Sequence, residues 1–320
     1  MVFMGARQHG KMSDAADAPS PVCQSELGLV CMTTTDEVRF RTITLKSYSA
    51  LPEDARAPRL AELYADNLAR LLRGLEFCAR ERIRLFRMSA HLFPLADYAD
   101  GVGWAVLQGL RADLARVGQR ARALGIRLLI HPEQFIVLNS ERPEVAATSA
   151  RVLAFHADVL DLMDLPASAW APIILHAGKR GRMPELVQAI AALPANARAR
   201  LALENDEVSV GAQDVLGVCR AAGVPMVFDA HHHVVKEKLP DQEDASVRAF
   251  TLEARATWPD PAWQIVHLSS GIEGPHDRRH ADLISVYPSA YLDVPWVEVE
   301  AKGKETAIRD LRARAPFVGR

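Results

Sequence analysis

The sequence predicts an α/β fold, a single (β/α)8 TIM barrel, and three observations support this prediction. Short apolar runs alternate with longer segments of helical period along the chain, which is typical of repeated βα units. The runs number eight, which is the strand count of a closed barrel. No glycine-rich phosphate loop follows the first run, and this disfavours the alternative, a doubly wound open sheet.

The apolar runs are the expected strands of the barrel. They lie at residues 27–31, 84–88, 127–130, 172–175, 201–203, 226–228, 264–268 and 294–299. Gly125 and Gly223 stand just before the third and the sixth run, as glycine does where a helix ends and the chain turns into a strand.

The segments between the runs are the expected helices. Tyr64 and Leu71 lie on one face of the first, and Val145 and Val152 lie on one face of another, which begins near Pro143. Further helices are expected at about residues 103–123, 182–193, 211–222, 243–256, 279–287 and 303–313.

Composition narrows the class of protein. Of 320 residues, 49% are hydrophobic, so the chain can bury a large core and is not disordered. A net charge of −2 excludes a uniformly basic DNA-coating protein but not a local cationic patch. We expect residues 1–22 to be a disordered leader, with Met12 as an alternative start, and residues 23–320 to be the barrel. The absence of a long apolar run, of a signal-like segment and of Cys-x-x-Cys pairs predicts a soluble cytoplasmic protein without disulfides.

Ionisable side chains gather where the apolar runs end. They are Arg87, His91, His131, His176, Glu204, Asp229, His231, His232, His233, His267 and Glu300, with His280 in the segment after the seventh run. The C-terminal ends of all barrel strands meet at one face, so we expect one shared site there. A single histidine at such a place is usually satisfied by a backbone carbonyl, but so many histidines and carboxylates together need a bound cation.

The donor types indicate which cations suit this site. Imidazole and carboxylate without thiolate favour Mn²⁺, Zn²⁺ or Fe²⁺. Because the donors exceed what one ion needs, we expect two or three divalent ions, with Glu204 as a bridging carboxylate.

Basic side chains follow the same strands and predict a cationic rim around the metal site. They are Lys179, Arg180, Arg182, Lys236, Lys238, Arg278, Arg279, Lys302 and Lys304. A rim of this kind would bind phosphates and indicates phosphodiester hydrolysis, whereas the alternative is an ordinary solvated surface.

Seven motifs together resemble the UV damage endonuclease family, metal-dependent DNA repair nucleases related to endonuclease IV. They are FRMSAHLFP, HPEQFIVLNS, ILHAGK, LENDE, VFDAHHH, HLSSG and VEAKGKE, and the resemblance covers residues 27–305. It implies multi-metal incision of double-stranded DNA immediately 5′ to UV photolesions, leaving 3′-hydroxyl and 5′-phosphate ends. It also implies Mn²⁺ as the first choice of metal, Zn²⁺ or Mg²⁺ as alternatives, and a monomer associated with the bacterial nucleoid.

The resemblance also implies roles for individual residues. His131, His176 and Glu204 resemble the ligands of one ion. Glu204, Asp229, His267 and Glu300 resemble those of a second ion, and His232 and His280 those of a third. Catalytic roles fall to Glu204, Glu300 and His91, and DNA or lesion binding to Gln134, Phe135, Lys302, Lys304 and Arg87. Gln134 and Phe135 correspond to a pair that probes the duplex, where an aromatic ring can fill the gap of an opened base pair.

The chain departs from the family pattern at three positions. Leu29 and Thr33 stand where relatives carry tyrosine and asparagine, which puts those DNA contacts in doubt. Ile265 stands where relatives carry a lysine that can be carboxylated near the metals, so metal affinity or preference is expected to differ. Two other functions stay open at this point, a sugar isomerase-type metal barrel and a non-catalytic lesion-binding protein.

Overall fold

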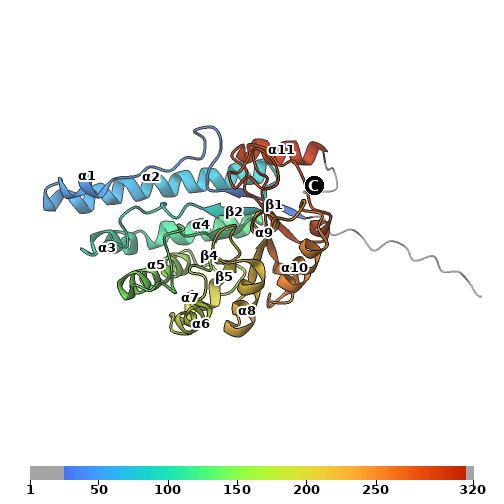
Figure 1. Cartoon of the computed structure of the whole chain (residues 1–320). Helices are drawn as coiled ribbons and strands as arrows, with labels where there is room; N and C mark the ends of the chain where they lie inside the picture. The colour runs from blue at the N-terminus through green and yellow to red at the C-terminus, as the bar shows by residue number, and fades with distance from the viewer. Residues whose placement is uncertain (1–24, 315–320) are drawn as a thin grey trace, which may run out of the picture.

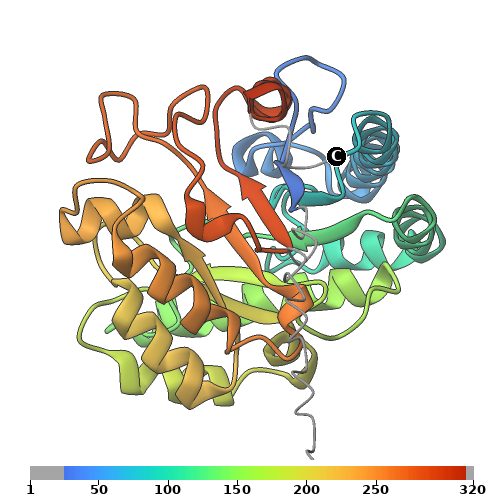
Figure 2. The same cartoon turned by 90° about the vertical axis from the view of Figure 1, so that its right-hand side faces the viewer.

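The computed structural model describes residues 25–314, which form a closed barrel of parallel strands (Figure 1 and Figure 2). The strands follow one another around the barrel in sequence order, and β8 pairs with β1 to close it. They are β1 (Glu26–Val30), β2 (Leu85–Met88), β3 (Arg127–Ile130), β4 (Ile173–His176), β5 (Leu201–Glu204), β6 (Met226–Asp229), β7 (Ile265–Leu268) and β8 (Trp296–Val299). The TIM-barrel prediction is confirmed. The predicted leader at residues 1–22 lies outside the described residues.

Helices surround the barrel, and α2, α4 and α5 lie side by side along one flank (Figure 1). They are α1 (Leu45–Ser49), α2 (Glu53–Arg80), α3 (Val102–Gly109), α4 (Arg111–Leu124), α5 (Pro143–Leu162), α6 (Met183–Ala191), α7 (Ala195–Arg200), α8 (Ala212–Ala222), α9 (Ala230–Glu237), α10 (Ala245–Arg255) and α11 (Lys304–Arg314). None of the described helices is long and apolar enough to cross a membrane.

Two expected helices differ from the structure. The segment 103–123 forms two helices, α3 and α4, that meet at Leu110. The prediction of a helix at 279–287 is wrong, because its backbone bonds to neighbouring loops instead of to itself: Ala281 N–H donates to Ser270, and Asp282 C=O accepts from Gly303. Helix α9 was not predicted, and it begins directly after Asp229, whose side chain accepts the His232 N–H at 2.7 Å.

The alternation of side chains along each strand decides what the barrel contains. Outward residues such as Phe86 and Val266 pack under the helices. The inward residues nearer the N-terminal ends, among them Leu85, Val227 and Ile265, form a separate apolar cluster inside the barrel. Polar inward residues such as Arg87, Glu204 and His267 come later on their strands, so the site has an apolar floor.

Arg127 closes the barrel beneath this floor. Its side chain is 1% exposed and donates to the carbonyls of Trp170 and Ala169 and, at 2.8 Å, to that of Trp263. Its guanidinium lies 4.6 Å from the Trp170 ring centroid and 5.2 Å from that of Trp296. Among the described residues no carboxylate pairs with Arg127, and burial lowers its pKa to about 9.

We expect Arg127→Ala to lower the free energy of unfolding by about 3 kcal/mol or more. The change leaves a cavity and removes the donors of three buried carbonyls, and each of these losses destabilises a folded protein. Urea denaturation measures the effect. Since Arg127 lies at the opposite end of the barrel from the strand-end carboxylates, activity per folded molecule should be unchanged, and a loss of activity larger than the loss of folded protein would contradict a purely structural role.

Candidate metal centre at the mouth of the barrel

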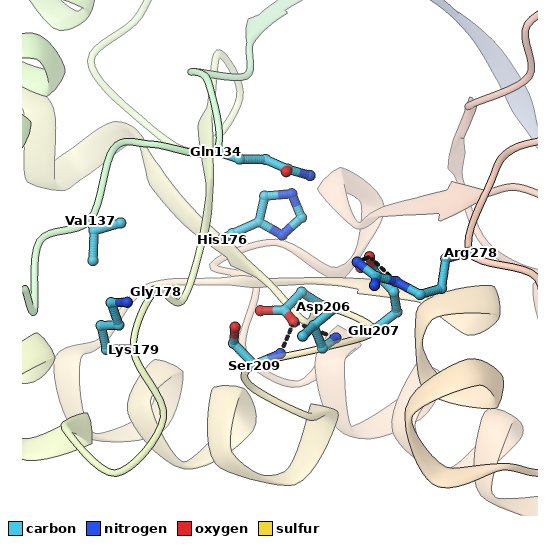
Figure 3. Close-up of a pocket in the computed structure, with 10 residues that line it drawn as sticks. Gln134, Val137, His176, Gly178, Lys179, Asp206, Glu207, Ser209 and Arg278 are labelled. Carbon is cyan, nitrogen blue, oxygen red and sulfur yellow. Dashed lines mark hydrogen bonds and ion pairs between the residues drawn. The ribbon is translucent and has the colours of Figure 1, made fainter.

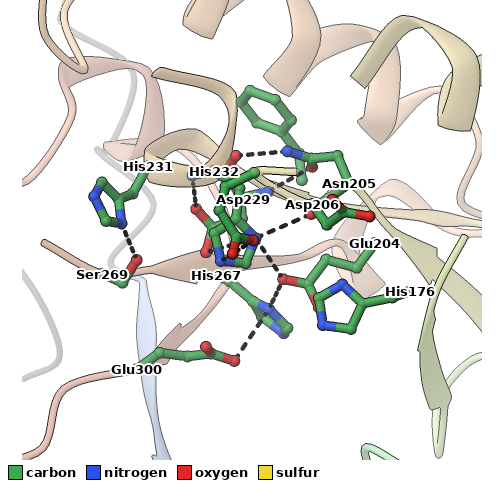
Figure 4. Close-up of polar contacts among 12 residues, drawn as sticks. His176, Glu204, Asn205, Asp206, Asp229, His231, His232, His267, Ser269 and Glu300 are labelled. Atoms are coloured by element: carbon green, nitrogen blue, oxygen red, sulfur yellow. Dashed lines mark hydrogen bonds and ion pairs between the residues drawn. The ribbon is translucent and has the colours of Figure 1, made fainter. Parts of the chain in front are cut away.

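Glu204, the last residue of β5, lies at the middle of the polar cluster. Its side chain is 1% exposed, and four histidines from different segments of the chain surround the carboxylate. Oε2 lies 2.8 Å from His131 Nε2, and Oε1 lies 2.9 Å from His267 Nδ1. Oε1 is also 3.3 Å from His232 Nδ1. Figure 4 shows His267 between Glu204 and Glu300, so the strand ends converge as the sequence predicted.

Three groups of donor atoms lie close enough to hold a metal ion. They are His131, His176 and Glu204; Glu204, His267 and Glu300; and Glu204, Asp229 and His232. Glu204 is common to all three groups. Asp229 groups with His232, whereas the resemblance had assigned it to the ion of His267 and Glu300.

The hydrogen bonding of His131 leaves a place for a proton or a metal ion beside Glu204. His131 Nδ1 lies 2.9 Å from the Pro132 carbonyl, which only accepts, so Nδ1 carries the ring proton. In the neutral ring Nε2 then presents a lone pair to a carboxylate oxygen 2.8 Å away. Two acceptors at this distance repel, and a proton or a metal ion between them removes the repulsion.

Several other buried atoms in the cluster have no hydrogen-bond partner in the described structure. Asp229 uses Oδ1 to cap α9, but its Oδ2 has no hydrogen-bond partner in the described structure, and neither has His176 Nδ1. Buried polar atoms are seldom left in this condition. The donor set and its unpartnered atoms therefore fit divalent ions.

The charges of the cluster favour the ionised forms of both His267 and Glu204. Burial alone would lower the pKa of His267, but Glu204, Glu300 and Glu298 outweigh it and raise this pKa to about 9. Burial opposes ionisation of Glu204, but His267 and His176 hold its pKa well below the ordinary value. The centre therefore favours negative carboxylates that attract a cation.

His232 and His280 define another side of the centre. His232 Nδ1 lies 3.0 Å from the Asn205 carbonyl and so carries the proton, which leaves the Nε2 lone pair 3.8 Å from Glu207 Oε2. The His232 and His280 ring centroids are 5.9 Å apart, and His280 Nδ1 lies 3.7 Å from Glu300 Oε2. Glu207 was not among the predicted residues, although it belongs to the LENDE motif.

Arg87 lies inside the barrel, not on its outer surface. Its side chain is 10% exposed, and its Nη2 contacts the carboxylates of both Glu298 and Glu300. The same nitrogen lies 3.2 Å from His267 Nε2. This position gives Arg87 contacts with the candidate ligands instead of the DNA contact expected from the sequence.

The other predicted DNA-binding residues lie around the mouth. Phe135 is 70% exposed, in the loop after β3. Figure 3 shows Gln134 beside the His176 ring in a pocket whose far wall carries the Glu207–Arg278 ion pair. Lys302 is exposed, and Lys304 begins α11.

The remaining residues singled out from the sequence lie outside the three donor groups. His91 is 65% exposed, lies 2.8 Å from Glu133 Oε1 and is in none of the three groups. Leu29 and Thr33 are buried, and Thr33 Oγ1 accepts the Val38 N–H, so neither faces DNA. Ile265 belongs to the apolar floor.

Part of the predicted cationic rim is engaged within the protein. Arg278 pairs with Glu207, Arg279 pairs with Asp277, and Arg182 donates to the Asn139 carbonyl. Lys236 donates to the carbonyls of the loop after β5. These cations therefore shape the loops around the mouth instead of standing free in solvent.

The fold and the site together define a class, a TIM-barrel enzyme whose mouth carries a candidate centre for divalent metal ions. The sequence profile of UV-endonuclease UvdE matches residues 25–316, so the chain belongs to that family. The "UV DNA damage endonuclease" of Deinococcus radiodurans is 54% identical over 293 residues, which are 91% of this chain and 96% of the relative. The predictions of this family and of an enzyme are confirmed.

Solved structures agree with this assignment. The crystal structure of SacUVDE has a TM-score of 0.75 and 27% identity, and the match covers 91% of this chain and 99% of that one. A D-tagatose 3-epimerase-like protein has a TM-score of 0.55 at 10% identity, covering 91% of this chain and 96% of its own. The second likeness shows only a shared fold, so the sugar isomerase alternative gains no support from it.

Proposed function

We propose that the chain hydrolyses the phosphodiester bond immediately 5′ to a UV photolesion in duplex DNA, leaving 3′-hydroxyl and 5′-phosphate ends. The observation that carries the proposal is Glu204, a buried carboxylate shared by three donor groups beneath an open mouth. Two or three divalent ions would be held there, Mn²⁺ first, with Zn²⁺ or Mg²⁺ as alternatives. We further propose that the enzyme acts as a monomer on the DNA of the bacterial nucleoid.

Each donor group of the centre would hold one metal ion. His131 and His176 would hold one ion with Glu204, His267 and Glu300 a second with the same carboxylate, and Asp229, His232 and His280 the remaining position. When bound, such ions polarise the phosphate and lower the pKa of water. Glu204 would contribute a ligand to both positions, because its two oxygens face different histidines.

The rim would hold the duplex over this centre. Phe135 projects into solvent close to Gln134, which itself lines the pocket beside His176. An inserted ring stacks on bases, and a lesion lowers the cost of opening the duplex by a few kcal/mol. Lys302 and Lys304 would bind backbone phosphates. His91, paired with Glu133 outside the three groups, is proposed to act at the edge of the DNA path.

A nicking assay tests the proposed function. UV-irradiated and unirradiated duplexes of one sequence are incubated with the protein and Mn²⁺, and end-labelled products locate the cut. We expect cleavage of the irradiated duplex alone, immediately 5′ to the lesion, with 3′-hydroxyl ends that a polymerase extends. Absence of nicking in both duplexes would overturn the proposal.

We expect Phe135→Ala to reduce the preference for irradiated over unirradiated duplex by about 10- to 100-fold, because stacking on an aromatic side chain contributes about 1–3 kcal/mol per base. A ring that is 70% exposed adds little to stability, so the fold should be unaffected. Competition binding with the two duplexes measures the preference. Phe135→Tyr should restore it, and Leu252→Ala, at an exposed apolar residue on α10, is the matched control. Unchanged preference in Phe135→Ala would contradict insertion of this ring.

A further inference from the structure

One side chain from the loop after β3 holds the loop after β4, residues 177–182. This side chain is Asn139, which is 2% exposed. Its Nδ2 donates to the carbonyls of Ala177, Lys179 and Arg182, and its Oδ1 accepts the Lys179 N–H at 2.9 Å. A buried amide that bonds so many backbone groups of another segment fixes the shape of that segment.

The two loops fit one another closely. Gly178 has a φ of +76°, and a Cβ at this position would lie 2.3 Å from Asn139 Oδ1, so only glycine leaves room for the amide. The Asn139 carbonyl accepts from Arg182 Nε at 2.9 Å. The Val137 N–H donates to Ser149 Oγ on α5 at 2.8 Å. The two loops therefore form one unit that is anchored to α5.

This unit lines a pocket beside the candidate metal centre. The pocket has a volume of about 210 Å³, and Figure 3 shows Gly178 and Lys179 on the wall opposite Arg278. His176, which belongs to one of the three donor groups, lines the same pocket. A ligand in the pocket would therefore lie next to the candidate metal ions.

The charges that face the pocket favour an anion. Asp206 accepts the N–H groups of Val208 and two following residues, and Glu207 pairs with Arg278, so both acidic side chains already have partners. Lys179 is exposed, and within residues 25–314 no carboxylate pairs with its ammonium. Lys179 is therefore the positive charge that the pocket offers to a ligand.

We propose that this pocket binds a backbone phosphate that neighbours the scissile one in the strand to be cut, with Lys179 as the binding residue and Asn139 as the residue that positions it. A strand whose scissile phosphate lies over the metal centre brings its next phosphates to the mouth, and lysine contacts with phosphates add to affinity. Asn139 holds both the N–H and the carbonyl of Lys179, which lowers the cost of ordering this loop on binding. This inference rests on the proposed function.

Nicking kinetics test the binding role of Lys179. Single-turnover nicking of irradiated duplex by the full-length, Mn²⁺-loaded protein is measured over a range of protein concentrations, which separates the half-saturating concentration from the maximal rate. We expect Lys179→Met to raise the half-saturating concentration about tenfold and to keep the maximal rate within about twofold. The slope of log affinity against log salt concentration should fall by about 1. Lys46→Met is the matched control, because Lys46 lies on α1, far from β4 in Figure 1.

Neutral phosphates locate the contact. Methylphosphonates, which carry no charge, replace the phosphates near the cut one at a time in the strand to be cut. We expect one position at which the wild-type protein loses affinity about tenfold and Lys179→Met loses no more. If Lys179→Met lost as much affinity as the wild-type protein at every position, Lys179 would not bind a phosphate there.

A double variant tests the positioning role of Asn139. We expect Asn139→Ala to raise the half-saturating concentration about 3- to 10-fold, and to add nothing when combined with Lys179→Met, because Asn139 acts through Lys179. Effects that multiply in the double variant would show a separate structural role and overturn the positioning. Gly178→Ala serves if Asn139→Ala does not fold, since its Cβ displaces the amide without removing it, and the same combination with Lys179→Met decides.

The outcomes separate this inference from the proposed function. Wild-type half-saturation and salt dependence in Lys179→Met would overturn the phosphate site while the wild-type protein still nicked irradiated duplex. Absence of nicking by the wild-type protein would overturn the proposed function, and this inference with it.

Discussion

Replacing Glu204 with glutamine is expected to lower the nicking rate on irradiated duplex by about 10³-fold or more. The amide keeps the shape of the side chain but removes the charge that all three donor groups share. The contacts of Oε2 with His131 and of Oε1 with His267 would then lose their electrostatic basis. Single-turnover nicking with saturating Mn²⁺ measures the loss.

Metal content separates this effect from unfolding. We expect Glu204→Gln to bind fewer metal ions than the wild-type protein, by at least one equivalent. Its circular dichroism spectrum should match that of the wild-type protein. Glu81→Gln is the matched control, because Glu81 pairs with Arg309 at the end of α2, away from the mouth. If Glu204→Gln nicked at more than a tenth of the wild-type rate, Glu204 would not be the bridging carboxylate.

The centre could be predicted from the sequence because of a geometric property of the fold. In a parallel barrel every strand ends at the same face, so the residues that follow the eight apolar runs must lie near one another. This can be predicted from the sequence although no distance is known. His131, Glu204 and His267 come from the ends of different strands, and they meet because these ends share one face of the barrel.

The direction of individual side chains could not be read from the apolar runs alone. Arg87 follows an apolar residue on a strand and was grouped with DNA-binding residues, but the alternation of side chains turns it inward with Leu85. The same period of two, counted back from Glu300, would have identified Glu298 as an inward carboxylate. The nitrogen that each histidine offers could not be predicted, because it is set by carbonyls such as those of Pro132 and Asn205 in the following loops.

The wrongly predicted helix at 279–287 is another feature that local sequence spacing could not decide. Its sequence has helical spacing, but the loops after β7 and β8 compete for its backbone groups. The bridge between Gly271 and His280 places His280 near Glu300, so the segment serves the site as an extended loop. Tertiary contacts of this kind override local propensity.

Stripping the protein of metal is expected to abolish nicking and to preserve much of its recognition of damage. The donor atoms of the three groups are buried or half-buried, whereas Phe135 projects from the loop after β3 outside those groups. After dialysis against a chelator, nicking should fall to background and return with added Mn²⁺. Affinity for irradiated duplex should stay within about tenfold of that of the loaded protein, since an exposed ring and rim lysines make the contacts.

Stability should respond to the same treatment. Without cations, Glu204 faces both Glu300 and Asp229 at close range. Ions that bind only the folded chain stabilise it by about 2.7 kcal/mol at a concentration 100 times the dissociation constant. Thermal unfolding of the stripped protein should therefore begin at a lower temperature and rise as Mn²⁺ is titrated. Glu204→Gln should show a smaller rise, because its ion positions share no bridging charge. Nicking by stripped protein in the presence of chelator would contradict a metal-dependent centre, whatever its affinity for damaged DNA.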